Sequence, residues 1–84
     1  MLDLATEKTH LAKAELDITE GEDRVTHQAG LVERLRVAGQ DVAVAERLLS
    51  TLRQTLLAWK DHRNIILMTI ARLEREQGGS ERHR

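Results

Sequence analysis

The sequence predicts an all-α protein, an antiparallel two-helix hairpin that is coiled-coil-like and dimerises into a four-helix bundle. Three observations support the hairpin. Apolar residues recur at a mean spacing of about 3.5 residues, the period of a coiled-coil seam. Proline is absent, which is compatible with long uninterrupted helices. Trp59 is the only aromatic residue, whereas strands favour aromatic side chains.

The first helix is expected over residues 3–38 of a single 84-residue domain. Asp3 suits its N-cap, because the carboxylate can accept from free backbone N–H groups. A strict seven-residue apolar repeat follows, made of Leu4, Leu11, Ile18, Val25 and Val32. The seam positions between them are weaker, namely Glu7, Ala14, Gly21, Gln28 and Leu35. The first helix therefore has a less apolar seam than the second helix.

The turn is expected at residues 39–41. Gly39 suits the left-handed residue that closes a helix, and Asp41 suits the N-cap of the next helix. A connection this short makes the two helices antiparallel neighbours.

The second helix is expected over residues 42–77. Its seam runs from Val42 to Leu73, and every position except Arg63 is apolar. Gly78-Gly79-Ser80 is expected to end the helix. The remaining tail, residues 78–84, has no apolar residue to bury and is expected to be mobile unless something docks it.

Antiparallel pairing about this turn places residue i beside roughly residue 80 − i. Gly21 then lies opposite Trp59, and we interpret the glycine as the gap that accepts the indole; a tolerated surface glycine is the alternative. The predicted hairpin seam comprises Leu11, Ile18, Gly21, Val25, Val32, Leu35, Leu49, Leu52, Leu56, Trp59, Ile66 and Ile70.

Two polar residues fall within this seam. Gln28 lies opposite Leu52 and is the kind of polar seam residue that fixes register. Arg63 lies beside Asp17, so we expect its guanidinium to reach that carboxylate. Both residues are interpreted as structural.

One seam between two helices leaves other large apolar residues uncovered. The predicted interaction surface comprises Leu31, Val37, Val44, Leu48, Leu57, Ile65, Leu67 and Met68. Exposed apolar strips mark interaction surfaces. Packing this strip against a second copy gives a four-helix bundle, so the expected partner is the chain itself, as a homodimer. Another helical protein is the alternative partner.

The charge balance argues against nucleic acid or a membrane as partners. The chain carries 13 basic and 14 acidic residues, interspersed, for a net charge of −1. The longest apolar run, Ile65-Ile66-Leu67-Met68, is far shorter than the roughly 20 residues of a membrane span. Residues 1–7 carry acid where a signal peptide carries base. We expect a cytoplasmic protein, and the absence of cysteine fits a reducing compartment.

Residues that would support catalysis are missing or isolated. There is no thiol nucleophile, and neither Ser50 nor Ser80 lies in a nucleophile-elbow sequence. The glycines do not form a phosphate-binding loop. We expect a protein that is not an enzyme and has no cofactor.

Metal or small-ligand binding by a four-helix bundle is the alternative function. Glu7 and His10 have the Glu-x-x-His spacing of di-iron bundles, and His62 is a third candidate ligand. Those bundles use the motif twice, whereas it occurs once here, so a solvated Glu and His are favoured.

Nucleic-acid binding by a regulator is the third possible function. The arginine groups of this chain are interrupted by acidic residues, and no aromatic side chains form a platform on which bases could stack.

A resemblance adds to this interpretation. The run Gly39-Gln40-Asp41, followed by Ala45-Glu46 and Leu48-Leu49 and, after Trp59, by His62-Arg63 and Ile66, resembles a family of short bacterial proteins of uncharacterised function. Similar upstream features are His10-Leu11-Ala12, Gly21-Glu22, Val25, Gln28 and Leu35. The resemblance spans roughly residues 9–73 and implies a helical hairpin, with no activity, cofactor or partner.

The function expected from the sequence is therefore non-enzymatic protein–protein interaction, by a small self-associating scaffold or a regulatory adaptor. The uncovered apolar residues either bind a further partner or form only a homodimer core. The sequence leaves both open.

Overall fold

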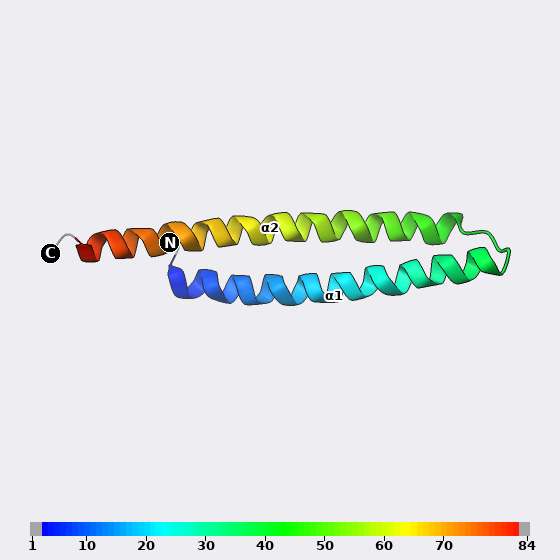
Figure 1. Cartoon of the computed structure of the whole chain (residues 1–84), viewed down its shortest axis with the longest axis horizontal. Coiled ribbons are helices and arrows are strands. Elements are labelled where there is room, and N and C mark those ends of the chain that lie inside the picture. Colours follow the sequence, from blue (N-terminus) through cyan, green and yellow to red (C-terminus); the bar gives the residue numbers. More distant parts are fainter. Residues whose placement is uncertain (1–2, 83–84) are drawn as a thin grey trace.

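The chain is an antiparallel hairpin of two long helices, as the heptad pattern predicts. The computed structural model describes residues 3–82, with side chains described through residue 78. Helix α1 spans Leu4–Val37 and helix α2 spans Ala43–Arg82. The helices lie side by side along a rod of 71 × 19 × 14 Å, and α2 extends past the start of α1 (Figure 1).

Asp3 caps α1, as predicted. One of its carboxylate oxygens accepts a hydrogen bond from the Thr6 backbone N–H at 2.8 Å, and the other accepts from the Thr6 hydroxyl at 2.9 Å. These donors stabilise the charged carboxylate, so the pKa of Asp3 is lowered from its ordinary value, mainly by the backbone hydrogen bond from Thr6. The helix therefore begins next to its sequence-predicted cap.

The turn is closed by a Schellman motif centred on Gly39. The Gly39 N–H donates to the carbonyl of Arg36 at 3.0 Å, and the Gln40 N–H donates to that of Leu35 at 2.9 Å. Gly39 has a φ of 72°, a left-handed conformation that suits glycine. The Asp41 carboxylate then accepts from the Ala43 N–H at 2.9 Å, at the start of α2.

The predicted end of the second helix is wrong. Instead of ending at Gln77, α2 continues through Gly78-Gly79-Ser80 to Arg82. Among the described residues Gly39 is the only glycine with a positive φ. Glycine inside a helix is unfavourable by only about 1 kcal/mol relative to alanine, so it weakens a long helix without forcing an end. Residues 83–84, the last part of the predicted mobile tail, and with them His83, lie outside the described residues.

The predicted seam residues are all buried or half-buried between the helices. The buried apolar side chains of the described chain are Ala14, Ile18, Val32, Leu49, Ile66 and Ile70. A cluster of Ala14, Ile66 and Ile70, with Leu4 and Leu11 against it, lies where α1 begins. These contacts agree with the predicted pairing of residue i with roughly residue 80 − i.

Gly21 faces Trp59, as predicted. A Cβ atom added to Gly21 would lie 3.2 Å from Trp59 Cζ3 and 3.2 Å from Leu56 Cδ1. Gly21 is buried, so the alternative of a surface glycine is wrong. The absent side chain is what allows the indole to approach the backbone of α1.

Neither described helix contains a segment long and apolar enough to cross a membrane.

Candidate interaction surface

The large apolar side chains outside the seam are exposed along most of the rod. All eight predicted members of the interaction surface are exposed, from 37% for Leu31 to 79% for Val37. Leu16, which is 56% exposed, is a further member that the sequence analysis missed. It lies on the outer face of α1, where no seam position marks it.

These residues do not form one strip. We label each heptad abcdefg, with Leu4 of α1 and Val42 of α2 at position a, so that a and d form the seam. On a helix, positions g and c lie on one flank of that seam, and positions e and b lie on the other. The g and c positions hold Leu31, Val44, Leu48 and Ile65, the e and b positions hold Leu57 and Leu67, and the outer f positions hold Leu16, Val37 and Met68.

Ion pairs bridge the two helices on the e flank. Arg36 Nη2 lies 2.6 Å from Glu46 Oε1, and Lys60 Nζ lies 3.6 Å from Glu22 Oε2. Each pair joins an e position of α1 to an e position of α2. Exposed pairs of this kind contribute little energy, but they select one register and leave this flank polar.

Leu57 lies on this polar flank. It lines a surface groove of about 520 Å³ together with Arg36, Glu46 and Arg53. Its groove therefore combines charged side chains with apolar ones, which include Val32 and Leu49.

The g flank is more apolar in the half of the rod nearest the turn. Leu31 of α1 and Leu48 of α2 line a groove of about 530 Å³, with the seam residues Gln28 and Leu52 at its floor. Charged side chains of α1, including Arg24 and Arg34, border it. Apolar contact is thus available from α2, while α1 supplies a charged rim.

The c and g positions of α2 form a continuous row without a formal charge, which we call the α2 stripe. It consists of Val44, Leu48, Thr51, Thr55, Ala58, His62, Ile65 and Thr69. All are exposed except the half-buried Thr69. Over the same length the e positions of this helix hold three charged residues, Glu46, Arg53 and Lys60, beside the apolar Leu67, so the two flanks of α2 differ in charge.

Two of the three threonines of the α2 stripe bond back to their own helix. The Thr51 hydroxyl donates to the carbonyl of Arg47 at 3.1 Å, and the Thr69 hydroxyl donates to that of Ile65 at 3.0 Å. A threonine whose hydroxyl bonds back to its own helix turns its methyl group outward. Thr51, Thr55 and Ala58 are too small to stand out in the sequence as surface apolar residues, but their c and g heptad positions place them on this flank.

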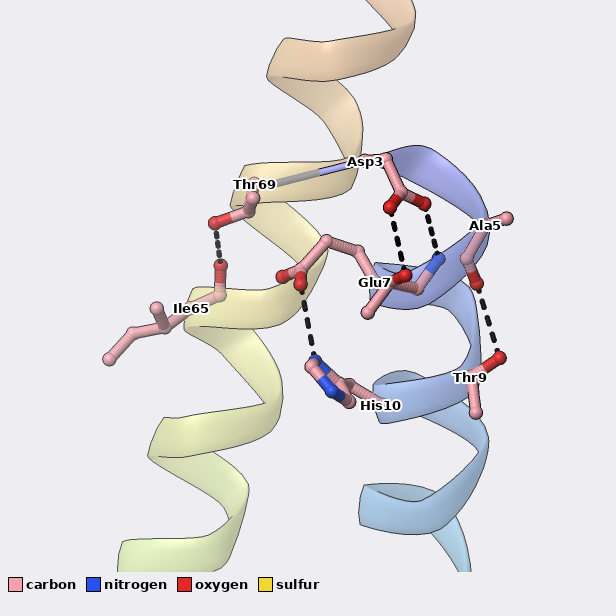
Figure 2. A network of polar contacts seen from close by, with 8 residues as sticks. Asp3, Ala5, Glu7, Thr9, His10, Ile65 and Thr69 are labelled. Carbon is pink, nitrogen blue, oxygen red and sulfur yellow. Dashed lines mark hydrogen bonds and ion pairs between the residues drawn. The ribbon is translucent and has the colours of Figure 1, made fainter. Parts of the chain in front are cut away.

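The candidate metal ligands are brought together only in part. Glu7 is buried, and its Oε2 lies 3.2 Å from Nδ1 of the exposed His10 (Figure 2). His62 lines a small groove with His10, Lys13 and Asp17. No group of three or more His, Cys, Asp or Glu side chains within the described chain is arranged to hold a metal ion. Glu7 and His10 remain a pair on one helix.

The predicted contact of Arg63 with Asp17 is wrong. Arg63 Nη1 lies 4.0 Å from Glu15 Oε2, while Asp17 pairs with Lys13 at 2.8 Å. The hydrogen bond and the charge of Asp17 raise the pKa of Lys13. Arg63 sits at position a, which borders the e flank, and Glu15 is on that flank, whereas Asp17 is on the g flank. The Nε atom of Arg63 is buried without a hydrogen-bond partner in the described structure.

Gln28 links the two helices through a hydrogen bond that the sequence did not indicate. Its side-chain amide donates to the backbone carbonyl of Ala45 at 3.0 Å. It also lines the same groove as Leu52, its predicted neighbour. A polar seam residue with a specific acceptor penalises other registers, which agrees with the role expected for it.

Comparison of the chain with protein-family models, with curated proteins and with solved structures gives no match. This result is consistent with a resemblance carried by helix and cap patterns, which implies a hairpin and brings no information on activity.

Proposed function

We propose that this protein is a non-enzymatic protein–protein interaction module, a small helical scaffold that self-associates. The observation that carries the proposal is the set of large apolar side chains exposed outside the hairpin seam. Leu31 and Leu48 line one groove together, and exposed apolar residues that are gathered in this way mark an interaction site. A second copy is the simplest cover, because closed symmetric pairs are the commonest soluble assemblies.

The surface area of the hairpin supports this proposal. The chain exposes 6,414 Å². A compact monomer of the same 9.6 kDa mass would expose about 5,100 Å². The difference, about 1,300 Å², exceeds the roughly 800 Å² that each partner buries in a stable interface. The hairpin therefore has surface to spare for a partner.

The thinness of the core points the same way. Ile18, with 3% of its surface exposed, is the most buried apolar residue described, and none falls below 2%. Only six apolar side chains of the described chain are buried. Chains this small often depend on disulfides, metals or oligomerisation for stability, and this chain has no cysteine.

The proposal includes a cytoplasmic location and no cofactor. A cysteine-free composition is compatible with a reducing compartment. The grooves described above are shallow channels between surface side chains. Among the described residues, two groups have shifted pKa values, Asp3 and Lys13; both are exposed, and a helix cap and an ion pair account for the shifts.

The molecular mass in solution tests the proposal. Sedimentation equilibrium is the suitable measurement, because a rod 71 Å long migrates anomalously in gel filtration. We expect a mass of twice 9.6 kDa at micromolar concentration, unchanged by a chelator. A monomer at every concentration would contradict self-association, and a dimer that forms only with added metal would favour the metal-binding bundle instead.

A further inference from the structure

We infer that two copies of this chain pair antiparallel through the α2 stripe, with a two-fold axis between Thr55 and Ala58. This inference rests on the proposed self-association and specifies its surface and its register. The helices α2 of the two copies would lie at the centre of the dimer, and each α1 would flank its own α2.

The α2 stripe is complementary to itself under such an axis. Residue i of one copy faces roughly residue 113 − i of the other. Leu48 then lies opposite the partner's Ile65, and Thr55 lies opposite the partner's Ala58. Large apolar side chains meet towards both ends, while small residues meet at the centre and allow the two backbones to approach.

Charge and the start of α2 favour this register over its neighbours. A shift of one heptad in one direction places Leu48 opposite the partner's Arg72, which sets a charged group against an apolar side chain and is unfavourable when the interface excludes water. A shift in the other direction places Ile65 opposite residue 41, which precedes α2, so that Ile65 loses its helical partner. In the inferred register Leu48 and Ile65 both face apolar side chains.

The ends of the stripe add charge complementarity. The first charged residue beyond one end of the stripe is Arg72, at position c, and beyond the other end it is Asp41, in the turn that precedes α2. They carry opposite signs, and antiparallel pairing brings the turn of one copy, with Asp41, towards Arg72 of the other. A second copy therefore matches this surface at its ends as well as along its length.

Two of the polar side chains of the stripe already have hydrogen-bond partners within their own helix. The hydroxyls of Thr51 and Thr69 already donate to carbonyls of their own helix, so their methyl groups form the contact surface. The e flank lacks this property, because Leu57 lies there among Arg36, Glu46 and Arg53. The g and c flank of α2 is accordingly the surface that a second copy covers at the lower desolvation cost.

Single-cysteine cross-linking tests this inference, because the chain contains no other cysteine. The variants are Ala58→Cys at the inferred axis, Val44→Cys at one end of the stripe, and Leu57→Cys on the other flank. Leu57 is level with the inferred two-fold axis but on the other flank of α2, so it tests which flank forms the interface. In an antiparallel pair the two copies of Val44 would lie about 37 Å apart along the helix axis at 1.5 Å per residue, so Val44 tests whether the helices pair antiparallel.

A short bis-maleimide linker should join two copies of Ala58→Cys and should leave Val44→Cys and Leu57→Cys unlinked. Equal linking of Val44→Cys and Ala58→Cys would show parallel pairing, and linking of Leu57→Cys alone would show that the other flank is the interface. Either result overturns the inference while a dimeric mass leaves the proposed function standing. A monomeric wild-type chain overturns both.

A charge variant gives an independent readout. Ala58→Glu places two carboxylates at the inferred axis and should abolish the dimer at concentrations where the wild-type chain sediments as a dimer. Leu57→Glu is the matched control and should remain dimeric. Far-UV circular dichroism shows whether each variant keeps its helices. A helical Ala58→Glu variant that still sediments as a dimer contradicts the inference.

Discussion

Gly21 shows how the omission of one side chain positions another. Its α-carbon lies where the indole of Trp59 and the side chain of Leu56 approach α1, and a Cβ atom there would come within 3.2 Å of both. Such contacts are tighter than ordinary packing, so the neighbours would have to shift. The small residue thus permits the large aromatic one to enter the seam.

Replacement of Gly21 by leucine should destabilise the hairpin by about 1–3 kcal/mol, because the added atoms overpack the contact with Trp59 and Leu56. Denaturant unfolding followed by circular dichroism measures the loss. Trp59 is the only aromatic residue, so its fluorescence reports on this contact without interference and should shift to longer wavelength. Gly30→Leu is the control, since a Cβ there meets only the flexible end of Arg34. Equal losses from both variants would contradict this account.

Asp3 predicts a pH dependence at the start of α1. Its lowered pKa means that the folded chain holds the proton less tightly than the unfolded chain does. The stabilisation is therefore complete above the ordinary value of 3.8 and is lost as the pH falls through the lowered value. The melting temperature of the wild-type chain should fall in that window.

The Asp3→Asn variant tests this prediction. Asparagine keeps an acceptor for the Thr6 N–H but does not titrate, so the variant should lose the component of the pH dependence that Asp3 contributes. Thermal melts of both chains from neutral pH to below 3.8 provide the comparison. Identical pH profiles would show that the cap contributes no titration.

At the scale of the helices, the sequence predicts one helix end well and another poorly. Gly39 is followed by Asp41, whose carboxylate accepts from the Ala43 N–H, and the Schellman hydrogen bonds close α1. At Gly78-Gly79-Ser80 the same residue types do not end α2. A glycine ends a helix where it takes a left-handed conformation and following N–H groups donate to the last free carbonyls of the helix. Composition alone does not show where this occurs.

The two glycines should therefore respond to alanine in opposite ways. Gly39→Ala should destabilise the hairpin by about 1–2 kcal/mol, because φ is 72° there. Gly78→Ala should increase the helix content near the end of α2, by up to about 1 kcal/mol of local helix stability, because a Cβ there meets nothing within 4 Å. Denaturant unfolding and far-UV circular dichroism measure these effects. A loss of helix in Gly78→Ala would be inconsistent with a continuous α2.

At the scale of the whole molecule, the heptad accounts for the fold because burial between two helices follows the period of the sequence. Each predicted seam residue is buried or half-buried. The pairing of residue i with roughly residue 80 − i gives the position along the rod but not the side of the seam. Arg63 borders the e flank, so it lies near Glu15 and not near Asp17. The exposed apolar residues are likewise divided between the two flanks and do not form the single strip that was predicted.

The dimer that we propose makes stability depend on concentration. Only folded hairpins can dimerise, so dimer formation shifts the equilibrium away from the unfolded chain by mass action. A tenfold rise in chain concentration should therefore raise the melting temperature. Melts followed by circular dichroism at several concentrations measure the shift. A melting temperature that does not change with concentration would show that the single hairpin supplies all of the stability.

The turn at Gly39 has one further consequence. It brings α2 back beside α1, so that the start of α1 and the end of α2 lie towards one pole of the rod and the turn lies at the other (Figure 1). In the inferred antiparallel pair these poles point in opposite directions, and the two copies of residue 78 are separated by about 65 Å along the axis. Such an assembly would be a rigid rod, and the distance between its two ends would be set by the number of residues in the helices.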